Sequence, residues 1–148
     1  MTTRIGTQTG FKNDFTTLDF DGAGALESCL WQFRVPADYA SGGTLKIQWQ
    51  TNSTSAQNCK WQAQVSAVTP ADADTVLEHA FAAAATVTTG ANTTEARRLI
   101  ESSITLTMDS AAAGDFITIR LFRDSADAAD TLTVDAEVLM VAFEYTTT

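Results

Sequence analysis

Apolar and polar residues alternate along several short stretches of the chain, which is the pattern of a strand that buries one face. The clearest stretch covers 44–51, where Leu45, Ile47 and Trp49 share one face and a lysine and two glutamines share the other. Polar connections separate this stretch from others of the same kind. The alternation predicts about eight strands, over 15–20, 29–35, 44–51, 61–67, 84–89, 99–108, 116–122 and 131–145.

The last third of the chain indicates how these strands are arranged. Two strong strand patterns, 116–122 and 131–145, flank an acidic, alanine-rich corner at 124–130. This corner is too long for a tight hairpin turn, so we expect the chain to cross there from one sheet to a second sheet. Long polar connections between paired sheets favour an all-β, two-sheet antiparallel sandwich of jelly-roll type. An immunoglobulin-like sandwich is the alternative, but the spacing of Cys and Trp does not match its inter-sheet disulfide pattern.

Two segments fit the strand pattern less well. The pattern at 70–81 predicts either a short helix, with aspartates near its N-terminal, positive end, or an ordered loop. Residues 1–12 are rich in Thr and Gly and carry Ile5, which indicates an extended arm. We expect one domain over 13–148. Such an arm is usually a frayed terminus. The alternative is an arm that becomes ordered only against a neighbouring subunit.

The charge of the chain limits the classes of partner that we expect it to bind. It has 148 residues and a net charge of −9, and its nine Lys and Arg residues are scattered. We therefore expect neither nucleic acid nor an anionic membrane as a partner. No apolar run approaches the roughly 20 residues of a membrane helix, and the N-terminus has no apolar signal core, so we expect synthesis in a cytoplasm. In that reducing compartment Cys29 and Cys59 are expected to be free, buried thiols rather than a disulfide.

Candidate chemistry is sparse. His79 is the only histidine, and no nucleophile pattern lies near it, so we expect a surface or packing residue. The most site-like group comprises the carboxylates of Asp124, Asp127, Asp130 and Asp135. These could bind calcium, but no Asp-x-Asp-x-Asp-Gly loop is present, so a solvated or hydrogen-bonded corner is favoured. The sequence predicts no enzyme activity, no cofactor and no metal site.

Aromatic residues suggest a sugar-stacking platform as another kind of site. Trp31, Trp49 and Trp61 all lie on the apolar sides of their strands, so packing in the core is the simpler expectation for them. Tyr39 falls in the predicted loop 37–43 and is the better candidate for an exposed aromatic.

Three stretches carry a resemblance to known proteins. They read FRVPADYASGGTLKIQW at 33–49, WQAQV at 61–65 and LFRDSADAADTLTVDAEVLMV at 121–141. Together they resemble small jelly-roll virion proteins of tailed bacteriophages, which serve as head decoration (cement) proteins and as parts of fibres. The likeness covers most of the chain from about residue 29 onward, apart from 70–94.

The resemblance implies a structural role on the exterior of a virion assembled in a host cytoplasm. The chain would form a homotrimer that binds the major capsid protein and stabilises its lattice mechanically. It implies partner contacts through the N-terminal arm, and Tyr39 is added as an aromatic contact. The alternative is a carbohydrate- or receptor-binding jelly-roll module of a phage tail or head fibre. The partner-binding candidates are Thr2, Thr3, Arg4, Ile5 and Tyr39.

Overall fold

The computed structural model describes residues 2–4, 15–24 and 26–148. Within this part of the chain every regular element is a strand. The nine strands are β1 (Thr2–Arg4), β2 (Phe15–Phe20), β3 (Leu26–Arg34), β4 (Tyr39–Gln50), β5 (Asn58–Val68), β6 (Ala85–Gly90), β7 (Ile100–Thr105), β8 (Phe116–Asp124) and β9 (Ala136–Thr147).

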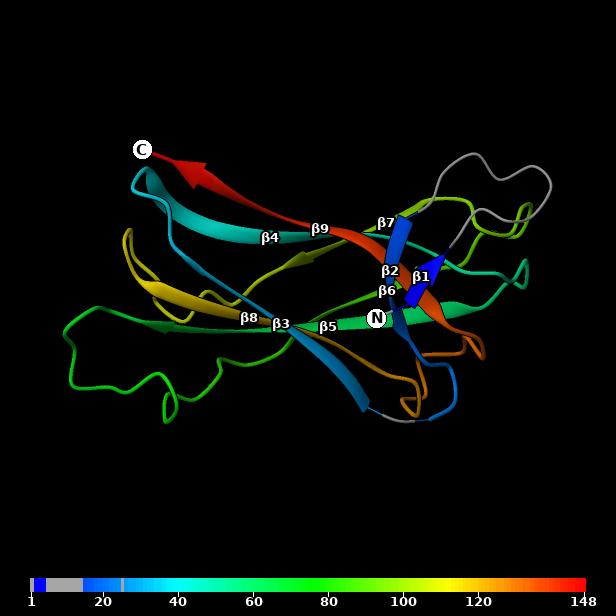
Figure 1. Cartoon of the computed structure of the whole chain (residues 1–148), viewed down its shortest axis with the longest axis horizontal. Coiled ribbons are helices and arrows are strands. Elements are labelled where there is room, and N and C mark those ends of the chain that lie inside the picture. Colours follow the sequence, from blue (N-terminus) through cyan, green and yellow to red (C-terminus); the bar gives the residue numbers. More distant parts are fainter. Residues whose placement is uncertain (1, 5–14, 25) are drawn as a thin grey trace.

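The strands form two antiparallel sheets that lie face to face (Figure 1). One sheet has the order β1-β2-β9-β4-β7, and the other has the order β3-β8-β5-β6. The pairs are nested, because β2 pairs with β9, β3 with β8, β4 with β7 and β5 with β6. Strands β8 and β9 belong to different sheets, as the acidic corner predicts. The prediction of an all-β, two-sheet antiparallel sandwich is confirmed.

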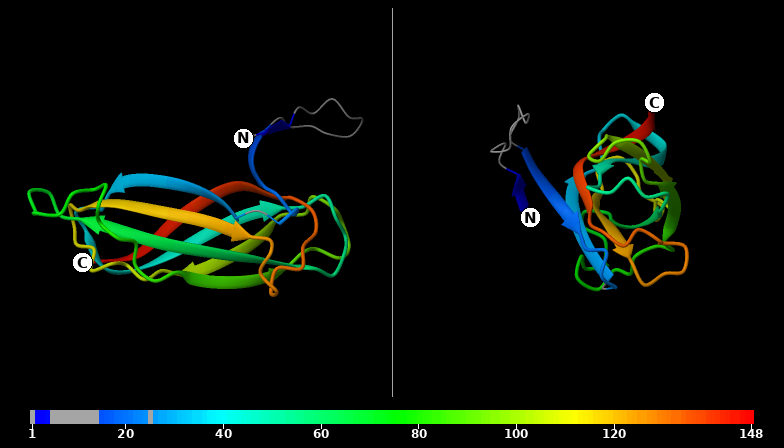
Figure 2. Two further views of the ribbon diagram at one scale, coloured as in Figure 1. Left: turned by 90° about the horizontal axis from the view of Figure 1, so that it is seen from below. Right: turned by 90° about the vertical axis from the view of Figure 1, so that its right-hand side faces the viewer.

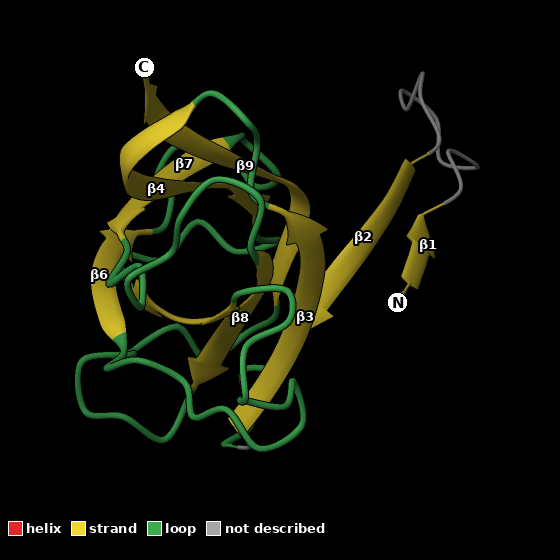
Figure 3. Ribbon diagram, turned by 90° about the vertical axis from the view of Figure 1, so that its left-hand side faces the viewer, coloured by secondary structure: helices red, strands yellow, loops and turns green. Residues whose placement is uncertain are grey.

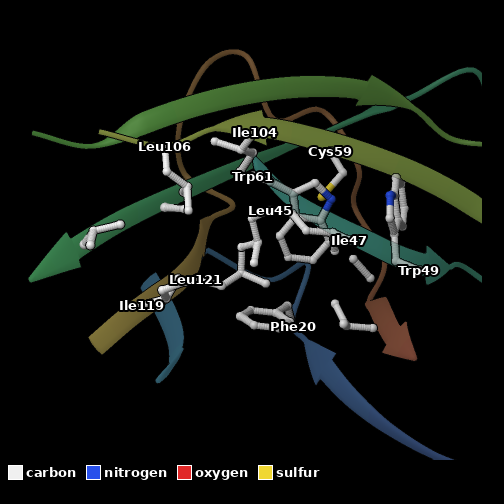
Figure 4. Packing of buried hydrophobic residues seen from close by; sticks show 14 of the residues in the cluster. Phe20, Leu45, Ile47, Trp49, Cys59, Trp61, Ile104, Leu106, Ile119 and Leu121 are labelled. Carbon is white, nitrogen blue, oxygen red and sulfur yellow. The ribbon is translucent and has the colours of Figure 1, made fainter. Parts of the chain in front are cut away.

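The core lies between the sheets and follows from the alternation in the sequence. Leu45, Ile47 and Trp49 of β4 are buried, whereas the residues between them are only half-buried. They face a second buried set from β5 and β8, and the two tryptophans of the core, Trp49 and Trp61, meet edge to face with ring centroids 5.8 Å apart. Phe20 of β2 packs against the same cluster, and its ring centroid lies 5.1 Å from that of Trp61 (Figure 4). Such edge-to-face contacts favour one fixed arrangement of the rings.

The structure corrects one local prediction and decides between the two alternatives left open for another. Residues 39–43 form the start of β4 and are not a loop, because the strand continues through them to pair with the end of β9. Residues 70–81 form an ordered loop and not a helix. This loop ends by adding to the sheet, where the amide of Ala82 donates to the carbonyl of Val65 at 2.8 Å. A helix would withdraw that amide from the sheet edge.

The two long sides of the sandwich differ. On one side β6 and β7, from opposite sheets, approach each other closely. On the other side β3 and β9 face each other, and no strand pairing joins them in the described part of the chain. Viewed along the strands, the body is rounded, and β1 and the first half of β2 leave it (Figure 3). The sandwich is therefore closed along one side and open along the other.

Candidate interaction surface

The open side of the sandwich, between β3 and the second half of β9, is called the seam below. Strand β3 pairs with β8 over its whole length, and its other edge has no partner strand among the described residues. Strand β9 pairs with β2 only over Ala136–Val138, so its edge from residue 139 to residue 147 also has no partner strand on that side within the described ranges. Two free strand edges thus line one groove, and such edges are templates for pairing with another chain.

A β-bulge in β9 marks the place where the seam opens. Gln48 pairs with Met140 and the next residue, Trp49, pairs with Val138, so Leu139 is an extra residue in β9. An extra residue bends its strand and increases the local twist. The pairing of β2 with β9 ends at Leu18 and Val138, directly before the bulge. The strand pairing of β2 with β9 therefore stops at the bend, although Thr16, Thr17 and Leu18 of β2 still line one hollow together with residues 138–141 of β9.

The floor of the seam is apolar. It holds two adjoining hollows of about 170 Å³ and about 270 Å³, which share Trp31 and Val141. The smaller hollow is lined by Trp31, Phe33, Leu45, Ile119, Val141 and Phe143. The larger is lined by Thr16, Thr17, Leu18, Cys29, Trp31, Val138, Leu139, Met140 and Val141. Trp31 and Phe33 are only half-buried although they point inward, because no strand joins β3 to the second half of β9 in the part of the chain that the structure describes.

Aromatic side chains continue the floor toward the far end of β9. The ring centroids of Phe33 and Phe143 lie 5.4 Å apart. The ring of Phe143 is stacked on that of Tyr145, with a centroid distance of 5.6 Å. Tyr39 lies 5.7 Å from Tyr145 and is only 7% exposed. The expectation that Tyr39 is an exposed loop aromatic is wrong, because β4 begins at this residue and turns its ring into the core. Its role in partner binding stays a prediction.

The hydroxyl of Tyr145 gives this aromatic end a polar anchor. It donates to a carboxylate oxygen of Asp38 at 3.0 Å. The carboxylate raises the pKa of Tyr145, because removing the phenol proton would lose that hydrogen bond and create a second negative charge. The end of β9 is thereby tied to the segment before β4.

The predicted N-terminal arm is described only in part. Thr2, Thr3 and Arg4 form β1, which pairs antiparallel with Phe15–Thr17 of β2. Ile5 lies outside the described residues. Figure 2 shows that β1 and the start of β2 stand away from the sandwich, while the end of β2 stays attached to β9. The described arm is thus a pair of strands that projects beside the seam.

A buried arginine fixes the corner from which β9 and β2 depart. Arg123 is completely buried, and its guanidinium makes a two-pronged ion pair with Asp130, with both N–O distances at 2.9 Å. Its remaining N–H groups donate to the carbonyls of Phe20, Leu132 and Val134, so all five donors are satisfied. Burial alone would lower the pKa of Arg123, but the hydrogen bonds and charge of Asp130 hold it above its ordinary value.

The acidic corner is therefore a hydrogen-bonded structure, as the sequence favoured. Asp127 accepts from the ammonium of Lys60 at 2.5 Å, which lowers the pKa of Asp127. Asp124 accepts from the amide of Ala126 within its own turn. No cluster of metal-ligating side chains occurs in the ranges that the structure describes. The sequence did not lead us to expect a buried role for Arg123, although this residue continues the inward alternation of Ile117, Ile119 and Leu121.

His79 holds two loops together. Its Nε2 lies 2.8 Å from a carboxylate oxygen of Asp109, and its Nδ1 lies 3.1 Å from one of Asp74. The same oxygen of Asp109 accepts from the amide of Ala67 at 2.9 Å. The hydrogen bonds to Asp109 and Asp74 raise the pKa of His79. This residue is a half-buried link at the surface, in keeping with the packing role expected for it.

Both cysteines are free, as predicted. Cys59 is fully buried, and its burial raises the pKa of the thiol, so the sulfur stays protonated. The prediction that Cys29 is also buried is wrong, because this residue faces the larger hollow of the seam and is only half-buried.

No family model, no curated protein and no solved structure matches this chain. No helix in the described part of the chain is long and apolar enough to span a membrane.

Proposed function

We propose that this chain is a structural protein of a bacteriophage virion, a capsid decoration subunit that binds the major capsid protein lattice from outside. The observation that carries the proposal is the β1–β2 strand pair that projects from the sandwich (Figure 2). A two-stranded hairpin is only marginally stable in water, so a projecting one needs a surface to bind. In a decoration subunit, that surface belongs to the capsid or to a neighbouring copy.

The strand order supports the jelly-roll type on which the resemblance rests. Strands β2 to β9 form four nested pairs split over two sheets, as if one long hairpin had been rolled up. A double-sheet roll of eight strands is the jelly-roll architecture found in viral capsid proteins. One fold can host many functions. The strand order therefore supports the proposed fold type, and the proposed function depends on the projecting strand pair.

The proposed mechanism is mechanical. Each subunit bridges neighbouring capsid proteins, and the surface buried in each bridge must be exposed again before the lattice can rupture. A contact of about 800 Å² per partner is enough for a specific interface. Many identical weak contacts on one shell add up through multivalency. The net charge of −9 keeps free subunits apart before they bind.

The fibre-module alternative finds less support in the aromatic residues. A sugar-stacking platform needs exposed rings, but Tyr39, Trp49 and Trp61 are buried. Trp31 is half-buried in the floor of the seam, where aromatic and aliphatic side chains line the smaller hollow. The seam therefore fits an extended protein segment better than it fits a sugar ring.

Co-sedimentation tests the proposed function. Capsids assembled from the major capsid protein encoded near this chain's gene are mixed with the purified protein and pelleted through sucrose. We expect saturable binding and a higher temperature of capsid rupture. A matched mixture with the chain lacking residues 1–14 measures how much of the binding depends on the arm. A protein that ignores capsids but is retained on a glycan array would contradict the proposal and favour the fibre module.

A further inference from the structure

We propose that the tip of the loop between β5 and β6 of one copy inserts into the smaller hollow of the seam of a second copy of this chain. The tip consists of Val76 and Leu77, and the hollow is the one lined by side chains of β3, β4, β8 and β9. This contact joins copies to one another whether or not they bind a capsid, so the inference goes beyond the proposed function.

The tip presents an apolar side chain almost completely to solvent. The loop extends beyond the ends of the strands (Figures 1 and 2), and there Leu77 is 97% exposed and Val76 is 47% exposed. The tip is a tight turn, in which the amides of Glu78 and His79 both donate to the carbonyl of Thr75. Turns are usually built from Gly, Pro, Asn, Asp or Ser. Two aliphatic residues in such a turn expose apolar area that a partner could cover.

The base of the loop holds this tip in place. His79 lies directly after the tip and is linked to Asp74 at 3.1 Å and to Asp109 at 2.8 Å. Three residues later the amide of Ala82 donates to the carbonyl of Val65 in β5. A tip that is already ordered loses little conformational freedom when it binds, so more of the contact free energy remains as affinity.

The smaller hollow has the size and polarity that a leucine side chain needs. Its volume is about 170 Å³, and all of its lining side chains are aromatic or aliphatic. An apolar cavity of about 150 Å³ holds a benzene molecule, so the four-carbon side chain of Leu77 fits the hollow. Residues of β2 line the larger hollow, and none of them lines this one. Insertion would cover Trp31 and Phe33, which are half-buried in one copy alone.

The charges beside the two surfaces are complementary. Asp72 and Glu78 are exposed on either side of the tip. Arg34 and Arg120 lie in β3 and β8, the strands that form one wall of the hollow, and Glu144 lies in β9 on the other wall. The acidic side of the tip would therefore face β3. Such charges set the orientation of a contact more than its affinity, which the apolar side chains supply. An anionic lipid surface would be repelled by the same acidic residues.

The tip of each copy lies at the wrong edge to fill its own hollow. The loop leaves from β5 and β6 at one edge of the four-stranded sheet, whereas the hollow opens at β3, the opposite edge. Because the contact joins two different surfaces, the copies are arranged head to tail, and they close into a ring where the rotation between copies permits. A ring of three copies would match the homotrimer that the resemblance implies.

Complementation between two altered copies tests the contact. Leu77→Lys removes the apolar tip but keeps the hollow. Val141→Lys keeps the tip but places a charge in the hollow, where Val141 is half-buried. Light scattering after size exclusion should show an oligomer for the unaltered chain and a monomer for each variant alone. A mixture should give a complex of one copy of each, because only one intact tip and one intact hollow remain.

A matched control separates the tip from exposed leucines in general. Leu99→Lys makes the same change at a side chain that is 57% exposed in the loop before β7, and it should leave the oligomer intact. Circular dichroism and thermal melting must show a folded sandwich for every variant that is scored.

Photo-cross-linking tests the contact without any change in the seam. Leu77 is replaced by the photoreactive residue benzoylphenylalanine, at a position so exposed that the fold does not depend on it. Irradiation of mixed unlabelled and ¹⁵N-labelled copies should join position 77 of one copy to peptides of the other copy that contain residues 31–33 or 141–143. This readout applies even where Val141→Lys does not fold.

Four results would overturn the inference. The unaltered chain could stay monomeric up to about 100 µM, well above a micromolar dissociation constant. The folded Leu77→Lys variant could form the same oligomer as the unaltered chain. Cross-links from position 77 could reach only other parts of the second copy. The unaltered chain could bind vesicles of phosphatidylcholine and phosphatidylserine while Leu77→Lys does not, which would assign the tip to a membrane. None of these readouts uses capsids, so failure of capsid binding and failure of this contact are told apart.

Discussion

Arg123 decides how the corner between β8 and β9 is built. Its five donors reach the carboxylate of Asp130 and three backbone carbonyls, one of which belongs to Phe20 at the end of β2. A charge this deeply buried is costly unless it is paired and fully hydrogen-bonded. The arginine thereby ties β2 to the corner and fixes the base from which the N-terminal hairpin projects.

Arg123→Met should lower the free energy of unfolding by about 3–5 kcal/mol, because it removes the ion-pair partner of the buried carboxylate of Asp130. Urea unfolding followed by tryptophan fluorescence measures the change. The matched control is Lys60→Met, which removes the half-buried ion-pair partner of Asp127 and should cost much less. Arg123→Met combined with Asp130→Leu should recover part of the loss. Equal costs for the two single variants would contradict the role given to Arg123.

His79 makes the stability of the protein depend on pH. Its pKa is raised above the ordinary value of 6.5 by its hydrogen bonds to Asp109 and Asp74, so the folded state binds the proton more tightly than the unfolded state does. The stabilisation is complete below pH 6.5 and is lost as the pH rises through the raised pKa. The melting temperature of the unaltered chain should exceed that of His79→Gln most at low pH. A gap that is constant or widens toward alkaline pH would be inconsistent with this link.

At the scale of the element, the bulge in β9 shapes the seam. Ala136 and Val138 point inward before it, and Val141 and Phe143 point inward after it, so only Leu139 breaks the alternation. Removing that one residue restores a regular strand without turning any core side chain outward. The bulge is therefore a local device that opens the seam, and the core does not require it.

Deletion of Leu139 should leave the protein folded and should extend the pairing of β2 along β9. Amide exchange measured by mass spectrometry should become slower in peptides that cover 140–145. The control is deletion of Arg120 from β8, which pairs without interruption on both sides. There the shift would turn Leu121 out of the core, and the sheet should not form. If both deletions are equally damaging, the bulge is needed for the fold.

The strands were predictable because their alternation survives in the sequence. The order of residues in β4 and β5 alone places Trp49 and Trp61 in the core. The loop at 70–81 was ambiguous, because its structure depends on distant partners such as the pairing of His79 with Asp109. The start of β4 was missed because Gly42 and Gly43 look like a turn, although β9 pairs with the strand on both sides of them.

The seam was not predictable from the same pattern. Alternation identifies Trp31 and Phe33 as inward residues but does not say whether the groove they face is closed. The opening depends on the single extra residue in β9 and on the path of β2 relative to it, which are relations between strands. A pattern of period two within one strand contains neither.

At the scale of the whole molecule, charge and apolar surface act against each other. Each copy has a net charge of −9, so copies repel one another at long range. The open seam is apolar, so a contact between copies through it would depend little on ion pairs. The strength of association between copies should therefore depend on ionic strength.

Association of copies should tighten several-fold when salt is raised from about 0.01 M to about 1 M, because the screening length falls from about 30 Å to about 3 Å. Sedimentation velocity over a dilution series measures the dissociation constant at each concentration of NaCl. The variant Val141→Lys serves as the control and should stay monomeric throughout, since salt removes repulsion between copies but does not restore the blocked seam. Association that weakens with salt would mean that ion pairs, and not the seam, hold the copies together.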